Sequence, residues 1–234
     1  MSQDDRFWPV ISDSSKAATL IITFEKDGET HVVLTTRALT MRSYPGEVAL
    51  PGGHAELDEN PQETALREAR EEIGFEMTKF KLESEQELPP YLSRNFLLVK
   101  PYLVKIGPKD GSEITLEDVA PQINIDEVDT VFSVPLSCFL KAETLSEEPL
   151  RMEWAGEDWY FYRFAVQNQV IEIIHTSDVE NKKPIEVTGL TAHILVDAAR
   201  VVLKAVPQFL HANILGYEVG VQYALRNGKI ASRI

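Results

Sequence analysis

Apolar residues recur in two short runs near the start of the chain, and both runs are rich in β-branched side chains. Residues 17–25 (AATLIITFE) and 31–37 (HVVLTTR) are predicted to be strands. Between them, KDGE contains the Asp27-Gly28 pair, which favours a tight turn, so we predict a β-hairpin here. Residues 46–53 (GEVALPGG) indicate a short strand that ends at a Pro-Gly-Gly corner.

A helix is predicted over residues 60–75. Asn60 is a favourable N-cap, Pro61 suits the first helical position, and Glu63 stands three residues after the cap, as in a capping box. Gly74 is placed to end the helix. Further strands are predicted over 95–106, 129–134, 157–166 and 184–187, further helices over 188–206 and 207–225, and polar insertions over 83–94 and 108–126. No break in composition divides the chain, so we predict one domain over 1–234.

Composition and charge narrow the class of protein. The chain has 234 residues, 44% of them apolar, which suits a soluble globular protein with an ample core. No apolar run approaches the ~20 residues of a membrane helix, and the acidic start lacks the layout of a signal peptide. The single cysteine, Cys138, favours a reducing compartment, and its apolar neighbours indicate a buried side chain. The net charge of −14 repels nucleic-acid backbones, so a phosphate-rich ligand would need metal ions or aimed arginines.

Three glutamates share one side of the helix predicted over 60–75. Glu68, Glu71 and Glu72 stand at i, i+3 and i+4, whereas the apolar stripe suited to a core is formed by Leu66, Ala69 and Ile73. Like charges at these spacings destabilise a helix by about 0.2–0.5 kcal/mol per pair, and a hard cation would reverse that cost. The helix alone leaves two interpretations open: a divalent-metal site, or a solvated face neutralised by Arg67 and Arg70.

The segment GHAELDENPQETALREAREEIGF, residues 53–75, extends this pattern. It has Gly53, five residues, Glu59, seven residues, and then the run from Arg67 to Phe75. The spacing resembles the Nudix box of the Nudix hydrolases at every defined position, and nine restricted sites make a chance match very improbable. The resemblance implies an α/β (α+β) Nudix fold, with a mixed β-sheet sandwiched between α-helices. It also implies hydrolysis of a nucleoside diphosphate linked to another group.

In this family the box holds Mg²⁺ or Mn²⁺ against the substrate pyrophosphate. The resemblance makes Glu68 and Glu72 the firmest metal ligands, Glu71 a close third, and the carbonyl of Gly52 a further ligand. Many members add an acid from a downstream loop, and the stretch IDEVDTVFSVPL (125–136) makes Glu127 the candidate. For Glu127 a surface acid or a helix cap is an equally good interpretation.

The remaining box residues are expected to support the metal ligands. The resemblance implies that Arg67 orients Glu68 by pairing, and that Glu59 is a supporting acid. Gly53 would let the backbone pass close to metal and phosphate, where a Cβ would intrude. Divalent ions would neutralise charge on the phosphate and activate water, and a carboxylate would accept the proton. Which carboxylate acts as the base varies within the family, so the sequence does not assign it.

The stretch before the box, VLTTRALTMRSYPGEVALPGG (33–53), carries a second pattern. It places Arg37, Arg42, Gly46 and the Pro51-Gly52-Gly53 corner at intervals that resemble the upstream signature of the coenzyme A diphosphatase subfamily. Leu50 stands where that family usually has Phe, and Tyr44-Pro45 is a second departure. Two arginines beside a metal site suit a ligand with a pyrophosphate and a 3′-phosphate. Without the resemblance, Arg37 could equally end a strand at the surface and Arg42 pair with Glu47.

The likeness spans roughly residues 17–203, with a helical tail over 207–234. It implies hydrolysis of coenzyme A (CoA), its thioesters or its disulfide to 3′,5′-ADP and the corresponding 4′-phosphopantetheine. The alternatives are a Nudix hydrolase of oxidised nucleoside triphosphates such as 8-oxo-dGTP, and a non-catalytic nucleotide-binding module. We expect a small-molecule partner such as CoA or a CoA ester, no nucleic acid polymer, no membrane, and a monomer or homodimer.

Two further features have a bearing on location and on the acyl end of the substrate. The chain ends Ser232-Arg233-Ile234, a variant of the peroxisomal address Ser-Lys-Leu, so we expect a peroxisomal protein, with cytosol or mitochondrion as alternatives. Aromatic side chains in the predicted strand region could stack on adenine or line an acyl channel, although core packing is commoner for such residues. They are Trp154, Trp159, Tyr160 and Tyr162.

Overall fold

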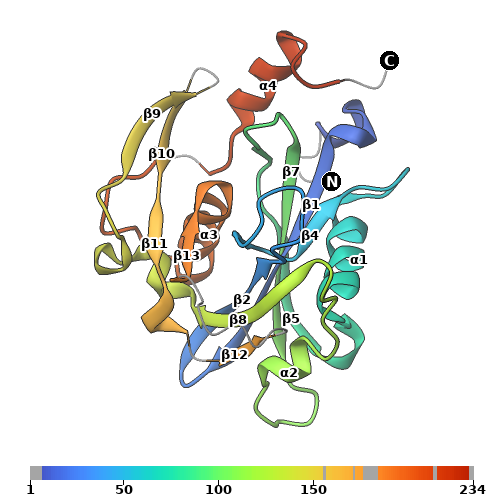
Figure 1. The fold of residues 1–234 in the computed structure, drawn as a ribbon, viewed down its shortest axis with the longest axis vertical. Helices are drawn as coiled ribbons and strands as arrows, with labels where there is room; N and C mark the ends of the chain where they lie inside the picture. The colour runs from blue at the N-terminus through green and yellow to red at the C-terminus, as the bar shows by residue number, and fades with distance from the viewer. Residues whose placement is uncertain (1–6, 155–156, 171, 176–183, 213–214, 232–234) are drawn as a thin grey trace.

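A nine-stranded mixed sheet forms the centre of the molecule (Figure 1). The computed structural model describes residues 7–154, 157–170, 172–175, 184–212 and 215–231. The main strand order is β12-β8-β2-β1-β7-β5, with β3 beside β2, β4 beside β1 and β6 beside β7. All of these pairs are antiparallel except β1 with β7, which run parallel from Lys16/Leu98 to Phe24/Ile106.

The elements follow one another along the chain with short connections. The strands of the main sheet are β1 (Lys16–Lys26), β2 (Glu29–Arg37), β3 (Val48–Ala49), β4 (Gly52–His54), β5 (Lys81–Glu87), β6 (Tyr91–Leu92), β7 (Leu98–Gly107), β8 (Val128–Pro135) and β12 (Glu172–His175). Two small sheets pair β9 (Leu150–Trp154) with β10 (Glu157–Phe161), and β11 (Arg163–Ala165) with β13 (Glu186–Thr188). The α-helices are α1 (Pro61–Ile73), α2 (Leu116–Val119), α3 (Gly189–Leu203) and α4 (Glu218–Arg226).

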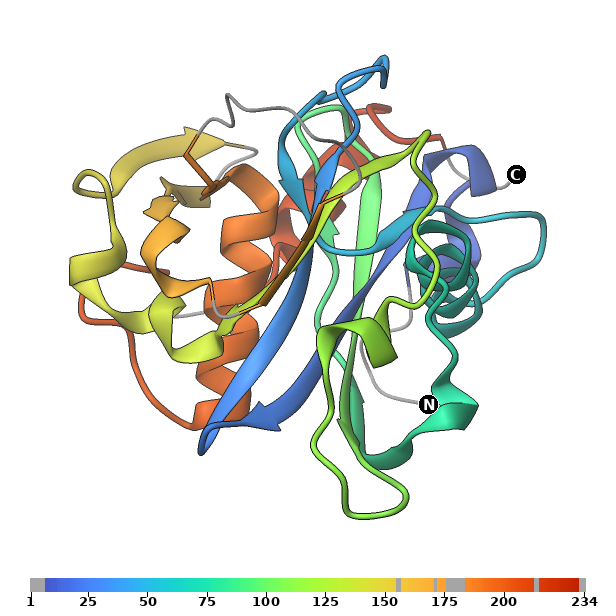
Figure 2. The same cartoon turned by 60° about the horizontal axis from the view of Figure 1, so that its bottom comes forward.

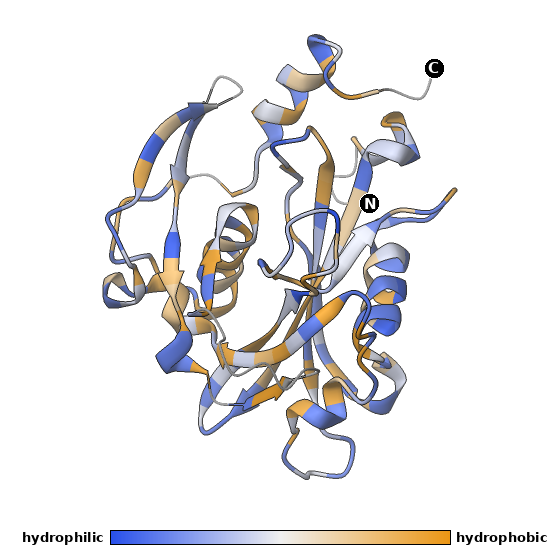
Figure 3. Ribbon diagram, in the orientation of Figure 1, coloured by the Kyte–Doolittle hydropathy of each residue, from blue (hydrophilic) through white to orange (hydrophobic). Residues whose placement is uncertain are grey.

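The sheet separates two hydrophobic cores, which confirms the predicted mixed sheet between helices. Alternate residues of β1 point to opposite faces: Ile21 belongs to the core under α3, and Leu20 and Ile22 to the core under α1. Figure 2 shows α1 and α3 on opposite sides of the strands. In Figure 3, α1 is mostly hydrophilic and α3 mostly hydrophobic. This difference follows from packing. Helix α3 lies between the sheet and the layer of β11 and β13, whereas α1 packs against the sheet on one side and is exposed on the other.

The strongest local patterns in the sequence are confirmed. β1 and β2 form the predicted hairpin, with Thr23 opposite Val32 and Lys26 opposite Glu29. The predicted strand over 46–53 is two short strands, since β3 ends before Pro51 and β4 begins after it. The predicted strand over 157–166 is likewise divided at Tyr162 into β10 and β11.

Other expectations are wrong, and each error has a physical reason. The polar insertion over 83–94 contains most of β5, an exposed edge strand without an apolar face to reveal it. The helix expected over 207–225 begins only at Glu218. The chain before it is held in irregular form by tertiary contacts: the Gln208 N–H donates to the Leu140 carbonyl (2.8 Å) and the Tyr217 N–H to that of Pro90 (2.8 Å).

None of the helices in the described ranges is both long and apolar enough to cross a membrane. The C-terminal tripeptide Ser232-Arg233-Ile234 lies outside the described residues, so the peroxisomal address stays a prediction from sequence.

Candidate active site

Helix α1 is fixed at both ends and along its inner face. The Asn60 side chain accepts a hydrogen bond from the Glu63 N–H (2.9 Å), and the Glu63 carboxylate accepts one from the Asn60 N–H (2.9 Å). This is the predicted capping box, and Gly74 ends the helix in the left-handed region. Ala65, Ala69 and Ile73 are fully buried in the core. The helix is therefore held in a fixed orientation, with Glu68 and Glu72 against β4.

Glu72 is the buried carboxylate of the site. It is only 6% exposed, and one of its oxygens accepts a hydrogen bond from the Gly52 N–H at 3.1 Å. Burial raises the pKa of Glu72 to about 8, and the charges of Glu68 and Glu127 act in the same direction. The Gly52 N–H and the charge of Arg37 oppose this shift. Glu72, Glu68, Glu127 and Arg37 therefore share one electrostatic environment.

Strand β4 brings its two glycines against these carboxylates. A Cβ on Gly53 would lie 2.5 Å from the Glu68 carboxylate, so no side chain fits there without displacing it. Gly52 has a φ of 154° and lies against β1, where a Cβ would come within 2.4 Å of the Ala18 carbonyl oxygen. Gly53 is thus needed for the close approach of β4 to α1, and Gly52 for its close approach to β1.

Arg67 links three carboxylates. Its Nε donates to Glu59 Oε1 at 2.7 Å, and its Nη1 donates both to Glu68 Oε1 (3.0 Å) and to Glu71 Oε2 (2.9 Å). Its Nη2 donates to the His54 carbonyl at 2.9 Å and to the second oxygen of Glu59 at 3.1 Å. Arg67 therefore holds Glu68, as the resemblance implied, and also binds Glu71, whose side chain is 51% exposed.

Glu59 is held as an ionised carboxylate. The guanidinium of Arg67 lowers the pKa of Glu59 to about 2, against the opposing effect of burial. The hydroxyl of Thr64 also donates to Glu59, at 2.9 Å. Thr64 is fully buried, and sequence reasoning missed its role. Burial raises the pKa of Glu68, and Arg67 opposes that shift. Glu59 therefore serves mainly to fix Arg67, and Arg67 to fix Glu68.

The upstream arginines take different positions. Arg37 ends β2 next to a register shift at Thr36, is half-buried, and donates from Nε to the Ser43 carbonyl at 3.1 Å. Its charge reaches Glu72. Arg42 is exposed in the loop over 38–47, and in the described part of the chain it forms no ion pair with Glu47. Arg37 is therefore coupled electrostatically to Glu72, whereas Arg42 lies on the exposed loop that follows β2.

Glu127 lies close enough for its charge to act on two glutamates of α1. Its backbone carbonyl accepts from the Ala38 N–H at 2.8 Å, which ties the loop before β8 to the loop that carries Arg42. The half-buried Glu127 carboxylate acts on the pKa of both Glu68 and Glu72. A segment some fifty residues beyond the box therefore adds its charge to the same site.

The donor chemistry of this site fits a hard divalent cation. Several carboxylates lie near one another and one is buried. The pKa of Glu72 is raised chiefly by burial and further by the charges of Glu68 and Glu127. In the ranges that the structure describes, no three His, Cys, Asp or Glu side chains are placed as a finished metal cluster. Arg67 instead holds the carboxylates of Glu68 and Glu71. The residues that could contribute oxygen ligands are Glu68, Glu71, Glu72, Glu127 and the Gly52 carbonyl.

The aromatic strand residues belong to the core. Trp159 and Tyr162 are 8% and 1% exposed, and Tyr160 is half-buried. Tyr162 packs edge-on against Phe209, with ring centroids 5.4 Å apart. The side chain of Trp154 lies outside the described residues. Cys138 is buried as predicted, and burial raises the pKa of its thiol to about 12, which leaves it unreactive.

The fold and the box helix define a class of enzyme scaffold, and comparison with known proteins identifies it. Residues 14–98 match the NUDIX domain. The chain is 36% identical over 213 residues to Nudix hydrolase 15, mitochondrial, of Arabidopsis thaliana, covering 90% of this chain and 65% of that protein. It is 30% identical over 238 residues to peroxisomal coenzyme A diphosphatase 1 of Saccharomyces cerevisiae, covering 82% of this chain and 69% of that protein.

The chain belongs to the Nudix hydrolase family. It is also 29% identical over 197 residues to the peroxisomal coenzyme A diphosphatase NUDT7 of Mus musculus, covering 84% of this chain and 74% of that protein. The chain spans less than two thirds of the Arabidopsis relative's length, at 65%.

Proposed function

We propose that this protein is a Mg²⁺- or Mn²⁺-dependent hydrolase of the pyrophosphate of CoA and its derivatives. The observation that carries the proposal is the buried Glu72 carboxylate, placed with Glu68 against the Gly52-Gly53 corner and in the field of Arg37. Such a site brings negatively charged oxygens close together, and bound cations would stabilise this arrangement. Arg37 at the end of β2, whose charge acts at Glu72, is suited to hold an anionic substrate there.

The carboxylates of α1 would position the reaction. Glu68, Glu72 and Glu71 would hold the divalent ions, with the Gly52 carbonyl and Glu127 completing the set. The ions would supply charge neutralisation on the phosphate oxygens and a lower pKa for water. Glu59 and Arg67 would keep Glu68 in place through their hydrogen bonds. Gly53 would leave room for the Glu68 carboxylate, because it has no side chain.

The overall step is balanced by one water molecule. Its oxygen forms a new bond to one phosphorus of the pyrophosphate, the bridging P–O bond breaks, and the bridging oxygen leaves with the other phosphate. A carboxylate of the site accepts the proton of the attacking water. The products from CoA are 3′,5′-ADP and 4′-phosphopantetheine, and acyl-CoA gives the acylated form.

The choice of CoA is supported by the loop over 38–47. The backbone N–H of Arg37 donates to the Glu47 carbonyl (3.0 Å), and the Gly46 N–H donates to the Arg37 carbonyl (3.0 Å). These two bonds join the ends of the loop that carries Arg42. The charge of Arg37 acts at Glu72, and Arg42 on the adjoining loop would add a second cation for a ligand with several phosphates. The names of the yeast and mouse relatives point to the same substrate.

The test is hydrolysis of CoA in ¹⁸O-labelled water with Mg²⁺ or Mn²⁺, followed by mass spectrometry of the products. We expect 3′,5′-ADP and 4′-phosphopantetheine, with one heavy oxygen in one of the two. In parallel, kcat/KM is compared for CoA and 8-oxo-dGTP. A clear preference for 8-oxo-dGTP would overturn the substrate assignment, and binding of CoA without turnover would identify a non-catalytic module.

A further inference from the structure

Thr64 places a buried hydroxyl in the second turn of α1, at a position where the helix itself gives no reason for one. Its side chain is fully buried, as are those of Ala65 and Ala69 on the same helix. Threonine is a weaker helix former than alanine, and a buried hydroxyl costs free energy unless it finds a hydrogen-bond partner. The benefit of Thr64 must therefore come from the group that its hydroxyl binds.

Two acceptors lie within reach of this hydroxyl. Glu59 Oε2 is 2.9 Å away, and the Asn60 carbonyl is 3.1 Å away. The carbonyl one turn back is the partner that a threonine within any helix can find. The Glu59 carboxylate is closer and is paired with Arg67, so it carries a charge and forms the stronger bond. The single proton of Thr64 therefore serves mainly Glu59.

The Glu59 carboxylate is fixed from several directions. Its Oε1 accepts from Arg67 Nε at 2.7 Å, and its Oε2 accepts from Arg67 Nη2 at 3.1 Å. The Glu56 N–H also donates to Oε2, at 2.9 Å, beside the bond from Thr64. The backbone of Glu59 is held separately, because Trp8 Nε1 donates to its carbonyl at 2.9 Å. Thr64 thus fixes the direction of the carboxylate, and Trp8 fixes the position of the chain.

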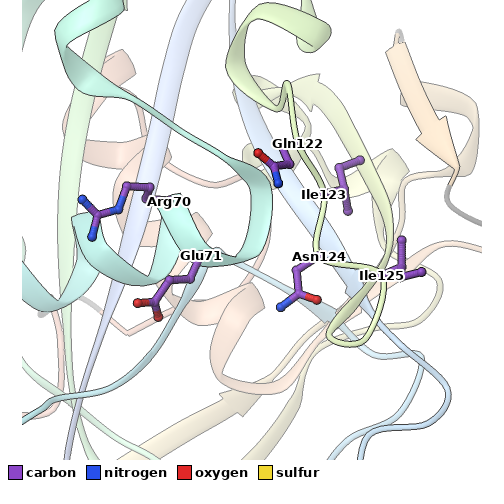
Figure 4. A pocket seen from close by; sticks show the side chains of 6 residues that line it. All are labelled: Arg70, Glu71, Gln122, Ile123, Asn124 and Ile125. Carbon is purple, nitrogen blue, oxygen red and sulfur yellow. The ribbon is translucent and has the colours of Figure 1, made fainter.

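The orientation of Arg67 follows from this contact and reaches the candidate metal ligands. Glu59 binds two nitrogens of the guanidinium, and the planar group then directs the third, Nη1, toward Glu68 Oε1 (3.0 Å) and Glu71 Oε2 (2.9 Å). In Figure 4, Glu71 extends away from the loop over 122–125, and its side chain is 51% exposed. The bond to Arg67 therefore holds Glu71 where packing does not.

We propose that Thr64 is a positioning residue for the metal ligands and acts through Glu59 and Arg67 on Glu68. The inference rests on the proposed function, since it concerns the same metal-binding carboxylates. The Thr64 hydroxyl keeps the Glu59 carboxylate turned toward Arg67, and the guanidinium keeps Glu68 in one orientation. A ligand that is already oriented loses less side-chain freedom on binding, so its affinity for a metal ion is higher.

The experiment measures Mn²⁺ binding by isothermal titration calorimetry, without nucleotide, for Thr64→Val and Thr64→Ser. Valine keeps the shape of threonine but has no hydroxyl, and we expect it to raise the Kd for Mn²⁺ about tenfold, the lower end of the effect of such outer partners. Serine keeps the hydroxyl and should leave the Kd within about twofold of the wild type. An unchanged Kd in Thr64→Val, or a loss in Thr64→Ser equal to that in Thr64→Val, overturns the inference.

Thr23→Val is the matched control. Thr23 on β1 is also fully buried, and its hydroxyl donates to the Val104 carbonyl at 2.9 Å. The same substitution there removes an equivalent bond in the hydrophobic core, so stability should fall while the Kd for Mn²⁺ stays the same. Should Thr64→Val fold poorly by urea denaturation, Thr64→Ala makes the same comparison with a better helix former.

The route through Glu59 is tested by a double-mutant cycle. In a Glu59→Ala background the Thr64 hydroxyl has no carboxylate to orient, so Thr64→Val should no longer change the Kd for Mn²⁺. A further loss of the same size in that background would show an effect that bypasses Glu59 and would overturn the proposed route.

Mn²⁺ binding requires no turnover, which separates this inference from the proposed function. If Thr64→Val weakens Mn²⁺ binding but the wild type hydrolyses no CoA, the proposed reaction fails and the positioning role stands. If the wild type hydrolyses CoA but Thr64→Val binds Mn²⁺ as the wild type does, the positioning role fails and the reaction stands. A wild type that binds no Mn²⁺ contradicts the positioning role as well as the manganese-dependent reaction.

Discussion

The burial of one carboxylate decides much of the chemistry at the residue scale. Glu72 is 6% exposed, and its pKa is raised to about 8 mainly by loss of solvent. A protein that needed Glu72 only for stability would do better with a neutral side chain, because an ionised buried group costs free energy. Its retention among other acids therefore indicates a functional requirement for a carboxylate at this position.

Glu72→Gln tests that requirement directly. The amide retains an oxygen to accept from the Gly52 N–H but cannot carry charge, so we expect kcat on CoA to fall by ~10²-fold or more. The melting temperature should stay equal or rise, because the buried charge is gone. Steady-state kinetics and thermal unfolding measure the two effects. Glu143→Gln, at an exposed position, is the control, and near-normal turnover in Glu72→Gln would remove this residue from the active centre.

At the scale of elements, the box helix is specified largely by its own sequence. Asn60, Pro61, Glu63 and Gly74 are all found in the roles their spacing predicts, because capping depends on residues within one turn. The edge strand β5 could not be found this way, since its pairing with β7 supplies its stability and its side chains are mostly exposed. Local signals thus place α1, and tertiary contacts place the strands at the edges.

Asn60→Ala should weaken the capping box while leaving the carboxylates in place. We expect a loss of about 1 kcal/mol in the free energy of unfolding, because the Glu63 N–H loses its acceptor. The active centre should be less affected, since Arg67 and Gly52 hold Glu68 and Glu72 independently. Urea denaturation and kcat on CoA measure the two quantities. Gln62→Ala, exposed in the same turn, is the control; equal stability of the two variants would contradict the role of the cap.

The site shows the same division between local and long-range information. The spacing of the box places Glu68 and Glu72 on one side of α1. Gly53 is expected from the sequence to allow a close approach to metal and phosphate, and the structure shows that its missing side chain makes room for the Glu68 carboxylate. The sequence could not reveal that Arg67 divides its hydrogen bonds among three carboxylates, or that Arg70 forms no ion pair among the described residues. Both depend on the folded positions of side chains. The position of Glu127 depends in addition on a loop that returns to α1 from about fifty residues downstream.

At the scale of the whole molecule, a buried polar network joins the C-terminal tail to the core under α3. His193 on α3 accepts from the Tyr217 hydroxyl at Nδ1 and donates from Nε2 to the Tyr160 carbonyl, so both nitrogens are satisfied in the neutral ring. Asp197, one turn further, accepts from the Tyr91 hydroxyl (2.6 Å), the Gly216 N–H (3.1 Å) and Arg200 (2.9 Å). Side chains of α3 thus hold both the β9–β10 layer and the tail.

The fold should lose stability in mild acid because of His193. Burial lowers the pKa of His193 to about 4 from 6.5, so the folded ring resists a proton that the unfolded chain accepts. The contribution of the neutral His193 ring to the free energy of unfolding is complete above pH 6.5. It is lost as the pH falls toward 4, at about 1.4 kcal/mol per pH unit and about 3 kcal/mol in all.

His193→Gln provides the comparison for this effect. Its amide can both donate and accept but does not titrate, so the variant should be less stable than the wild type at pH 7.5. As pH falls to 4.5, the difference in the free energy of unfolding should narrow, because only the wild type carries the histidine penalty. Urea denaturation at a series of pH values measures it. A difference that stays constant with pH would show that His193 is not the group responsible.

The parallel pairing of β1 with β7 has a consequence during protein synthesis. The hairpin of β1 and β2 leaves the ribosome first, but the outer edge of β1 must wait for Leu98–Gly107 and that of β2 for Val128–Pro135. At usual rates of translation the second wait is roughly 5–20 s. For that interval two apolar strand edges stand open to other chains. The nascent hairpin is therefore the segment of this protein with the greatest need of a chaperone.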